Sequence, residues 1–246
     1  MNNIQETLLF PFRDRDAWNQ FLIACAVMLA SFFIPILPSI LLLGYATQIM
    51  RQVILEKRAP SMPKWQGSDW GEMFMDGLKL YGAQLVFMLP FLLFFGCGII
   101  FILSGSIGFT ALAEESTRSF TPIAMVLLFF GVGITMVASL LAIPLGVVTS
   151  AAAGHVAAKR SFQAAFEFKE WWSIFRAAIG PFLLAYAIMM VTSFIFTFVI
   201  QIAMITLVLM CIVPFLMMPY MAYLLIISNV LYAQAYAKGQ EALQTA

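Results

Sequence analysis

The chain has 246 residues, of which 63% are hydrophobic and only 10% are charged, and its mean hydropathy is +0.96. A water-soluble domain is about half apolar and about one quarter charged, so this composition excludes a soluble globular protein. A bilayer accommodates apolar helices of this kind. The net charge of +1 gives no sign of the basic patch that nucleic-acid binding requires, and we expect no nucleic-acid partner.

The first apolar stretch, residues 18–50, contains no charged residue and is too long for one membrane-spanning helix. A helix crosses the hydrocarbon core with about 20 residues. Pro35 and Pro38 interrupt the stretch, because proline lacks an N–H donor and clashes with the preceding turn. The sequence predicts two short helices, over 18–34 and 38–55, joined by a tight turn. A re-entrant pair that does not fully cross the membrane is the alternative interpretation.

Three apolar runs follow, and the last, residues 179–236, is uncharged and long enough for two spans. Pro214 and Pro219 favour a break near its middle. We therefore expect an all-α, polytopic membrane helical bundle in a single domain, with about six spans in three hairpins. The predicted spans are 18–34, 38–55, 80–104, 121–148, 180–206 and 214–237.

The basic residues are distributed unevenly between the predicted loops. With six spans, every Lys and Arg except Arg118 falls on one side of the membrane, which is 12 of the 13. Loops rich in Lys and Arg face the cytoplasm. The sequence therefore predicts that the N-terminus and the C-terminus both lie in the cytoplasm.

A short amphipathic helix is predicted over residues 69–81, before the third span. Asp69 and Glu72 have the spacing of a capping box, in which each side chain satisfies a free backbone amide at the helix start. Apolar residues then recur at the spacing of one helix face. They include Trp70, Phe74 and Tyr81. A helix with one aromatic face and one charged face is typical of the membrane surface.

A second amphipathic segment is predicted over residues 161–176, before the fifth span. Tryptophan favours the headgroup level because its ring is apolar and its N–H can stay hydrated. All five tryptophans of the chain fall in such cytoplasmic segments. The aromatic residues of both segments form a candidate interaction surface, which we call the aromatic collar. It comprises Trp70, Phe74, Tyr81, Phe166, Trp171 and Trp172.

Small residues recur at four-residue intervals at the end of the fourth predicted span. They are Gly146, Ser150, Gly154 and Ala158. Such ladders let helix backbones approach closely. We expect them to pack helices within the chain, and a dimer interface is the alternative interpretation.

No motif commits the sequence to a reaction. Ionisable residues are missing from the membrane-crossing parts of the predicted spans, with Arg51 assigned to the loop that follows, whereas pumps and ion-coupled transporters keep such residues there. His155 is the only histidine, and no Cys or carboxylate stands near it at the sequence spacing of a zinc ligand. We predict no catalytic residue, no metal and no cofactor.

Several short stretches, taken in order, carry a resemblance to a known family. The most specific is DWGEMFMDGL, residues 69–78, and weaker ones are LLFPFRDRD at 8–16, PKW at 63–65 and AAFEF at 164–168. The chain resembles DUF4013, a bacterial and archaeal family of multi-pass membrane proteins of unknown function, distantly akin to the membrane domain of some glycerophosphodiester phosphodiesterases. The resemblance implies a helical bundle with cytoplasmic amphipathic segments, and it implies no activity.

We therefore expect a multi-pass protein of the cytoplasmic (inner) membrane of a prokaryote. The leading hypothesis is a non-enzymatic accessory subunit or scaffold that acts through helix–helix and cytoplasmic-surface association. Its expected partners are membrane lipids and either a second copy of the chain or a larger membrane complex. The alternative is a channel, scramblase or carrier for a neutral or lipid-like substrate, because proline-broken helices can form a site from backbone ends.

Overall fold

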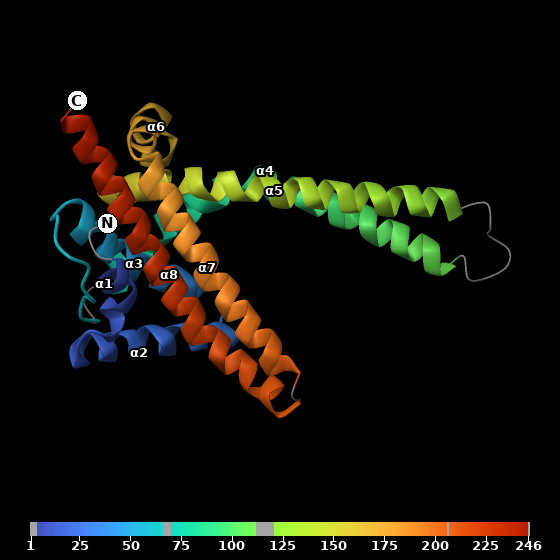
Figure 1. The fold of residues 1–246 in the computed structure, drawn as a ribbon, viewed down its shortest axis with the longest axis horizontal. Coiled ribbons are helices and arrows are strands. Elements are labelled where there is room, and N and C mark those ends of the chain that lie inside the picture. Colours follow the sequence, from blue (N-terminus) through green and yellow to red (C-terminus); the bar gives the residue numbers. More distant parts are fainter. Residues whose placement is uncertain (1–3, 66–69, 112–120, 206, 246) are drawn as a thin grey trace. The chain divides into compact units, whose positions relative to one another are not determined.

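The computed structural model describes residues 4–65, 70–111, 121–205 and 207–245, and every regular element in these ranges is helical (Figure 1). The elements are α1 (Ile4–Leu9), η1 (Phe10–Phe12), α2 (Arg15–Leu29), η2 (Ala30–Phe32), α3 (Leu37–Ile54), α4 (Trp70–Ala111), α5 (Thr121–Lys159), η5 (Phe162–Phe166), α6 (Phe168–Ala177), α7 (Ile179–Met204) and α8 (Leu207–Gln244). The all-α prediction is confirmed for this part of the chain.

The chain forms two compact units. Unit 1 comprises Met1–Ala83 and Ser150–Ala246, and unit 2 comprises Gln84–Thr149. Unit 1 thus holds α1, α2, α3, α6, α7 and α8, the first turns of α4 and the last turns of α5. Unit 2 holds the remainder of α4 and α5.

Four helices are long and apolar enough to cross a membrane. They are Trp70–Gly108, Pro122–Lys159, Ile179–Met204 and Phe215–Gln244. These helices correspond to the third, fourth, fifth and sixth predicted spans. Their length and apolar composition indicate a membrane protein.

The first two predicted spans have no counterpart among these four helices. α2 has 15 residues and α3 has 18, so they are about 22 and 27 Å long, which is less than the hydrocarbon thickness of about 30 Å. Most residues of α3 are buried inside unit 1. The apolar sequence of α3 therefore packs against other helices, and an apolar run of this length suits a protein core as well as it suits lipid.

The prolines do not break the last apolar block where the sequence indicates. α7 ends at Met204 and α8 begins at Leu207, so that Pro214 and Pro219 lie inside α8. Pro90 likewise lies inside α4. The expected boundary between 206 and 214 is therefore wrong. A proline in a membrane helix is tolerated because neighbouring groups and small local adjustments satisfy the carbonyl that it leaves free.

The two predicted surface helices have different outcomes. α4 runs without a break from Trp70 to Ala111, so 69–81 is the start of a long helix and no separate element. Asp69, half of the expected capping box, lies outside the described residues. The segment 161–176 does form elements of its own, η5 and α6, after a turn in which Arg160 has a φ of 54°.

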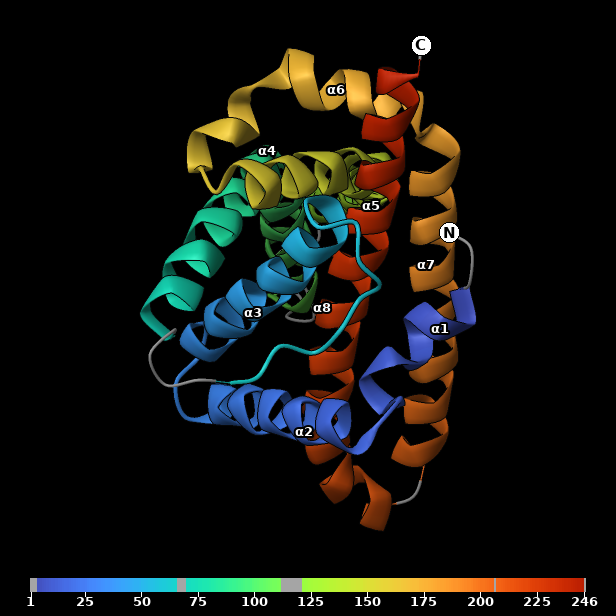
Figure 2. The same ribbon diagram turned by 90° about the vertical axis from the view of Figure 1, so that its left-hand side faces the viewer.

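α8 is the central helix of unit 1. It contacts α1, α2, α3, α6 and α7, and Figure 2 shows α7 running beside it while α3 crosses it. Its side chains Ala222, Ile226, Val230 and Tyr236 are fully buried. Ala222, Ile226 and Val230 pack with core residues of α2 and α3 that include Phe21, Leu42 and Tyr45. The apolar face of α8 therefore holds unit 1 together.

In unit 2, α4 and α5 pack through glycines. A methyl group at Gly131 of α5 would lie 2.7 Å from the amide nitrogen of Ile102 and 2.8 Å from the carbonyl oxygen of Gly98, both in α4. The opposite faces are apolar and open, with Leu93 65% exposed and Phe129 74% exposed. Apolar surface of this extent fits contact with lipid tails.

Two glycines also let α3 and α4 cross in unit 1. A methyl group at Gly44 would overlap the backbone carbonyl of Met73, and one at Gly77 would overlap the carbonyl of Ile40. The two helix backbones are therefore in direct contact, which is possible only because these residues have no side chain.

We expect Gly44→Ala to destabilise the protein by at least about 1–3 kcal/mol, the cost of inserting atoms into a packed core. Gly71→Ala is the matched control, because nothing lies within 4 Å of a methyl group there, and a helical Gly-to-Ala change stabilises by up to about 1 kcal/mol. Thermal unfolding of the purified protein in detergent measures both. Equal melting temperatures for the two variants would contradict the close crossing of α3 and α4.

Candidate functional site

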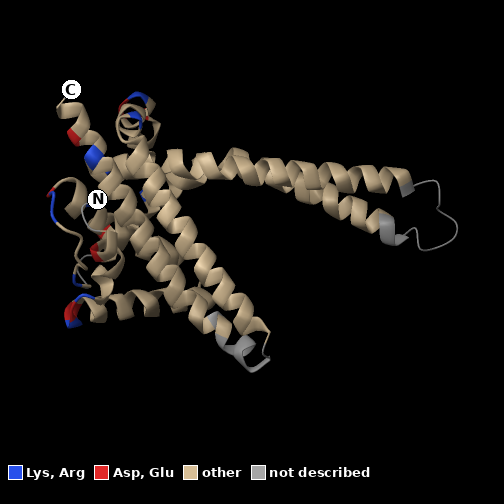
Figure 3. Ribbon diagram, viewed as in Figure 1, with Lys and Arg blue, Asp and Glu red and all other residues tan. Residues whose placement is uncertain are grey.

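Every charged residue that the structure describes lies in unit 1 (Figure 3). These residues occur on α1, on the start of α2 and the residues just before it, at the end of α3 and in the segment after it, in the first turns of α4, at the end of α5, on both sides of η5, on α6 and at the end of α8. We refer to them together as the charged region. It contains a buried ion pair, a histidine cluster and a cavity.

The ion pair joins Arg51 and Asp76. The Arg51 Nη1 donates to Asp76 Oδ2 at 2.5 Å, and the two side chains are 9% and 10% exposed. Arg51 Nε also donates to the carbonyl oxygen of Ala157 at 3.0 Å, and Lys79 Nζ donates to Asp76 Oδ1 at 3.3 Å. The guanidinium therefore links α3 to α4 and to α5. The sequence pattern places Arg51 in a loop, whereas the structure buries it in α3.

The segment that follows α3 is fixed by an aromatic stack. The rings of Tyr45 and Trp65 lie 4.3 Å apart and nearly parallel, and the Tyr45 hydroxyl donates to the carbonyl oxygen of Pro63 at 2.7 Å. Trp65 Nε1 donates to the carbonyl oxygen of Gln20 at 3.2 Å. These contacts explain why Pro63 and Trp65 belong to one short motif, because both secure the segment to α2 and α3.

The histidine cluster joins α5, α6 and α8. His155 is buried, its Nδ1 lies 2.6 Å from the Tyr236 hydroxyl and its Nε2 lies 2.9 Å from Glu167 Oε2. The Lys159 ammonium bonds to the carboxylates of both Glu167 and Glu170. Sequence spacing around His155 gives no sign of these carboxylates, because they approach the histidine only after the chain turns at Arg160.

His155, Glu167 and Glu170 present three possible metal ligands whose atoms lie within 4.8 Å of one another. No carboxylate stands at ligand spacing from His155 in the sequence, but the fold brings two of them to it. Lys159 already bonds to both carboxylates, so a metal ion would have to displace its ammonium group. Without a metal ion, the two carboxylates already have Lys159 and His155 as partners. Lys159 and, after it, His155 lower the pKa of the Glu167 carboxyl through their hydrogen bonds.

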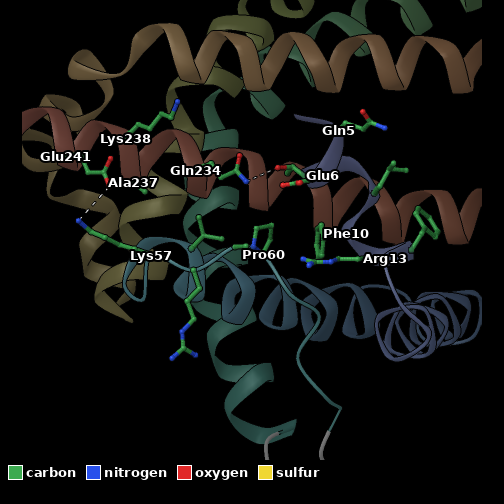
Figure 4. Close-up of a pocket in the computed structure, with 16 residues that line it drawn as sticks. Gln5, Glu6, Phe10, Arg13, Lys57, Pro60, Gln234, Ala237, Lys238 and Glu241 are labelled. Carbon is green, nitrogen blue, oxygen red and sulfur yellow. Dashed lines mark hydrogen bonds and ion pairs between the residues drawn. The ribbon is translucent and has the colours of Figure 1, made fainter. Parts of the chain in front are cut away.

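A cavity of about 860 Å³ lies between three segments of unit 1 (Figure 4). The segments are 5–13, the end of α3 with the residues after it at 53–60, and 234–241 on α8. Its charged lining residues are Glu6, Arg13, Lys57, Arg58, Lys238 and Glu241. Gln234 Nε2 donates to Thr7 Oγ1 at 2.9 Å across one side. Sequence reasoning missed this cavity, because the segment 234–241 is more than 170 residues away from the other two.

The structure divides the aromatic collar. Three of its residues are well exposed: Trp70 (46%), Phe166 (43%) and Trp172 (42%). Phe74 and Tyr81 are half-buried.

Trp171 is different, because it is only 3% exposed and its Nε1 donates to the carbonyl oxygen of Ala165 at 3.0 Å. Trp171 is thus a core residue. Its neighbour Trp172 points about 100° away around α6 and is exposed.

The small-residue ladder is also divided. Gly154 faces α8, where a methyl group would lie 2.8 Å from the ring of Tyr236. Ser150 is buried and Ala158 is half-buried in unit 1, while Gly146 belongs to unit 2. The neighbour of Gly154 therefore belongs to the same chain.

Comparison with protein families finds one match, to the family described as protein of unknown function (DUF4013), over residues 27–209. The match covers most of the chain, which therefore belongs to this family. No curated protein and no solved structure matches the chain. These comparisons give no support to the relation with the glycerophosphodiester phosphodiesterase membrane domain.

Removing one partner of the buried ion pair should lower the free energy of unfolding. We expect Asp76→Asn to destabilise the protein by about 3–5 kcal/mol, because it leaves the Arg51 guanidinium buried without its counter-charge. The double variant Arg51→Met/Asp76→Leu should recover much of that loss, since apolar groups of similar size replace both charges. Thermal unfolding in detergent measures the three proteins. A double variant no more stable than Asp76→Asn would contradict this account.

The histidine cluster should weaken in acid. Because its folded pKa is lowered, the Glu167 carboxylate stabilises the fold above its unfolded pKa of about 4.3, and this contribution is lost as the pH falls through the folded value. Glu167→Gln should melt below the wild type at pH 7, and the two melting temperatures should converge as the pH falls through the folded pKa of Glu167. The control Glu56→Gln alters a carboxylate whose partner Arg58 is 77% exposed. It should match the wild type throughout.

Proposed function

We propose that this member of the DUF4013 family is a multi-pass protein of the prokaryotic cytoplasmic membrane that acts by association, as a non-enzymatic accessory subunit or scaffold. One observation carries the proposal. All charged residues in the described part of the chain lie in unit 1, whereas the described residues of unit 2 are uncharged and expose large apolar side chains. Recognition of a partner outside the lipid therefore falls to unit 1.

The charged region also supports a cytoplasmic orientation. The described Lys and Arg residues all belong to unit 1, and positive charge is retained on the cytoplasmic side. On this proposal the ends of α5 and α8, together with η5 and α6, face the cytoplasm.

The association surface that we propose is the outer side of η5 and α6. Phe166 and Trp172 are exposed there while Trp171 and Phe175 are buried beneath them. Lys169 lies on the same short helix as Trp172. Tryptophan is one of the residue types that dominate the binding energy of protein interfaces.

The histidine cluster supports a structural role over a catalytic one. Both ring nitrogens of His155 lie within hydrogen-bond distance of the chain's own side chains, and the ring is 2% exposed. A general base needs access to the proton that it abstracts. Enclosed between α5, α6 and α8, His155 holds α6 in place and thereby fixes the surface that carries Trp172.

Association can be tested by purifying the tagged protein from its own cells in mild detergent. We expect a stoichiometric partner or a homo-oligomer, resolved by light scattering after size exclusion. The double variant Phe166→Ala/Trp172→Ala should lose the partner by at least about tenfold, since removing central aromatic anchors costs about 2 kcal/mol or more. Phe129→Ala is the matched control, because it removes an exposed aromatic ring from unit 2.

A monomer that transports lipid or a neutral solute in liposomes would overturn the association proposal. It would favour the carrier, scramblase or channel. An unchanged partner yield in the double variant would instead reject η5 and α6 as the surface.

A further inference from the structure

We propose that the cavity between α1, the end of α3 and the end of α8 binds the headgroup of an anionic phospholipid. This inference goes beyond the proposed function, because it assigns a ligand class to a second site. It rests on the membrane location of the chain and does not require the association through α6.

The charge of the cavity favours an anion. Four basic and two acidic residues line it, which leaves a net charge of +2. Lys57 Nζ lies 3.7 Å from Glu241, and Arg58 pairs with Glu56 at 3.2 Å. Arg13 and Lys238 make no ion pair with any residue that the structure describes. Unneutralised Arg and Lys side chains are suited to phosphate oxygens.

The remaining polar groups fit a headgroup larger than phosphate alone. Glu6 and Glu241 accept hydrogen bonds when ionised, and Gln5 and Gln234 also line the cavity. A bare phosphate would be repelled by the two carboxylates. A phosphodiester that carries hydroxyl groups satisfies both kinds of lining, because its phosphate faces the cations and its hydroxyls donate to the acids.

The apolar lining fits the start of an acyl chain. Leu9 and Phe12 line the cavity and are 49% and 44% exposed, while Phe10 is buried beside them. The Phe12 ring lies 5.5 Å from Trp18 and 6.0 Å from Tyr223. Tryptophan and tyrosine collect at the level of lipid headgroups. A ligand with both a charged and an apolar part is therefore favoured over a soluble phosphate.

The cavity lies at the end of the apolar part of α8, where a lipid headgroup would be expected. α8 carries no charge from Leu207 to Ala237, and Lys238 is its first charged residue. The cavity is lined by residues on both sides of this change, from Gln234 to Glu241. On the membrane helix to which the cavity is attached, this is where apolar sequence ends and the headgroup layer begins.

Lys57 is held in a backbone conformation that its side chain disfavours. Its φ is 52°, three residues after the end of α3, in the left-handed region that glycine adopts most readily. A residue with a Cβ costs roughly 1–2 kcal/mol in this conformation. Strain of this kind persists where a side chain is needed at a given position, and the Lys57 side chain reaches across the cavity to Glu241 (Figure 4).

Lys57→Gly provides a test that separates binding from folding, because glycine removes the charge and relieves the strained φ. Its control is Arg160→Gly, which removes a basic residue from the same backbone region, with a φ of 54°, outside the cavity lining. Native mass spectrometry of the full-length protein in detergent would measure binding of phosphatidylglycerol and of phosphatidylcholine with identical acyl chains.

We expect the wild type to bind phosphatidylglycerol at least about tenfold more tightly than phosphatidylcholine. Each basic side chain near an anionic lipid contributes roughly fivefold. Lys57→Gly and Arg13→Gln should each lose about that factor for phosphatidylglycerol alone. Arg160→Gly should bind as the wild type does. The melting temperature of Lys57→Gly should equal or exceed that of the wild type.

Equal binding of the two lipids would overturn the lipid site, as would equal losses of phosphatidylglycerol affinity in Lys57→Gly and Arg160→Gly. Displacement of phosphatidylglycerol by millimolar inorganic phosphate or glycerol phosphate would also overturn it, because it would indicate a soluble ligand. Loss of the protein partner in Phe166→Ala/Trp172→Ala bears only on the association surface. The two proposals therefore fail independently.

Discussion

The crossing of α3 with α4 and with the end of α5 depends on the buried guanidinium group of Arg51. This group pairs with Asp76 in α4, donates to the backbone of Ala157 in α5 and extends from α3. A charge in this position is stable only with its partner and its hydrogen bonds in place. The pair can form because Gly44 and Gly77 let the α3 and α4 backbones touch. One electrostatic contact and two missing side chains therefore fix how three helices meet.

The charged side chains of the histidine cluster are also neutralised by neighbouring side chains. Lys159 holds Glu167 and Glu170, and Glu167 in turn bonds to the buried ring of His155. These groups are satisfied by each other, so they bind α5, α6 and α8 together and leave α6 to present Trp172. At the cavity the balance is different, because Arg13 and Lys238 have no ion-pair partner among the described residues. The buried ion pairs hold the helices of unit 1 together, whereas Arg13, Lys238 and Lys57, whose partner Glu241 is itself half-exposed, are available to a ligand.

Much of the fold follows from composition and periodicity. The four long helices coincide with apolar runs that the sequence marks clearly, since a helix that crosses the hydrocarbon core needs about 20 predominantly apolar residues. The candidate surface was only partly predictable. Trp70, Phe166 and Trp172 are exposed, but Trp171 is buried. Adjacent positions on a helix point about 100° apart, and only the tertiary packing of α6 decides which of the two tryptophans faces inward.

The sequence by itself determined that this chain is helical, membrane-embedded and a member of its family, because hydropathy and local motifs are properties of contiguous residues. Tertiary structure alone decided that the apolar residues of α3 pack in a protein core. It also decided that Pro214 and Pro219 lie inside α8 and that Arg51 is buried. It also brought residues 5–13, 53–60 and 234–241 around one cavity. These outcomes depend on contacts between residues far apart in the chain, and no local pattern records them.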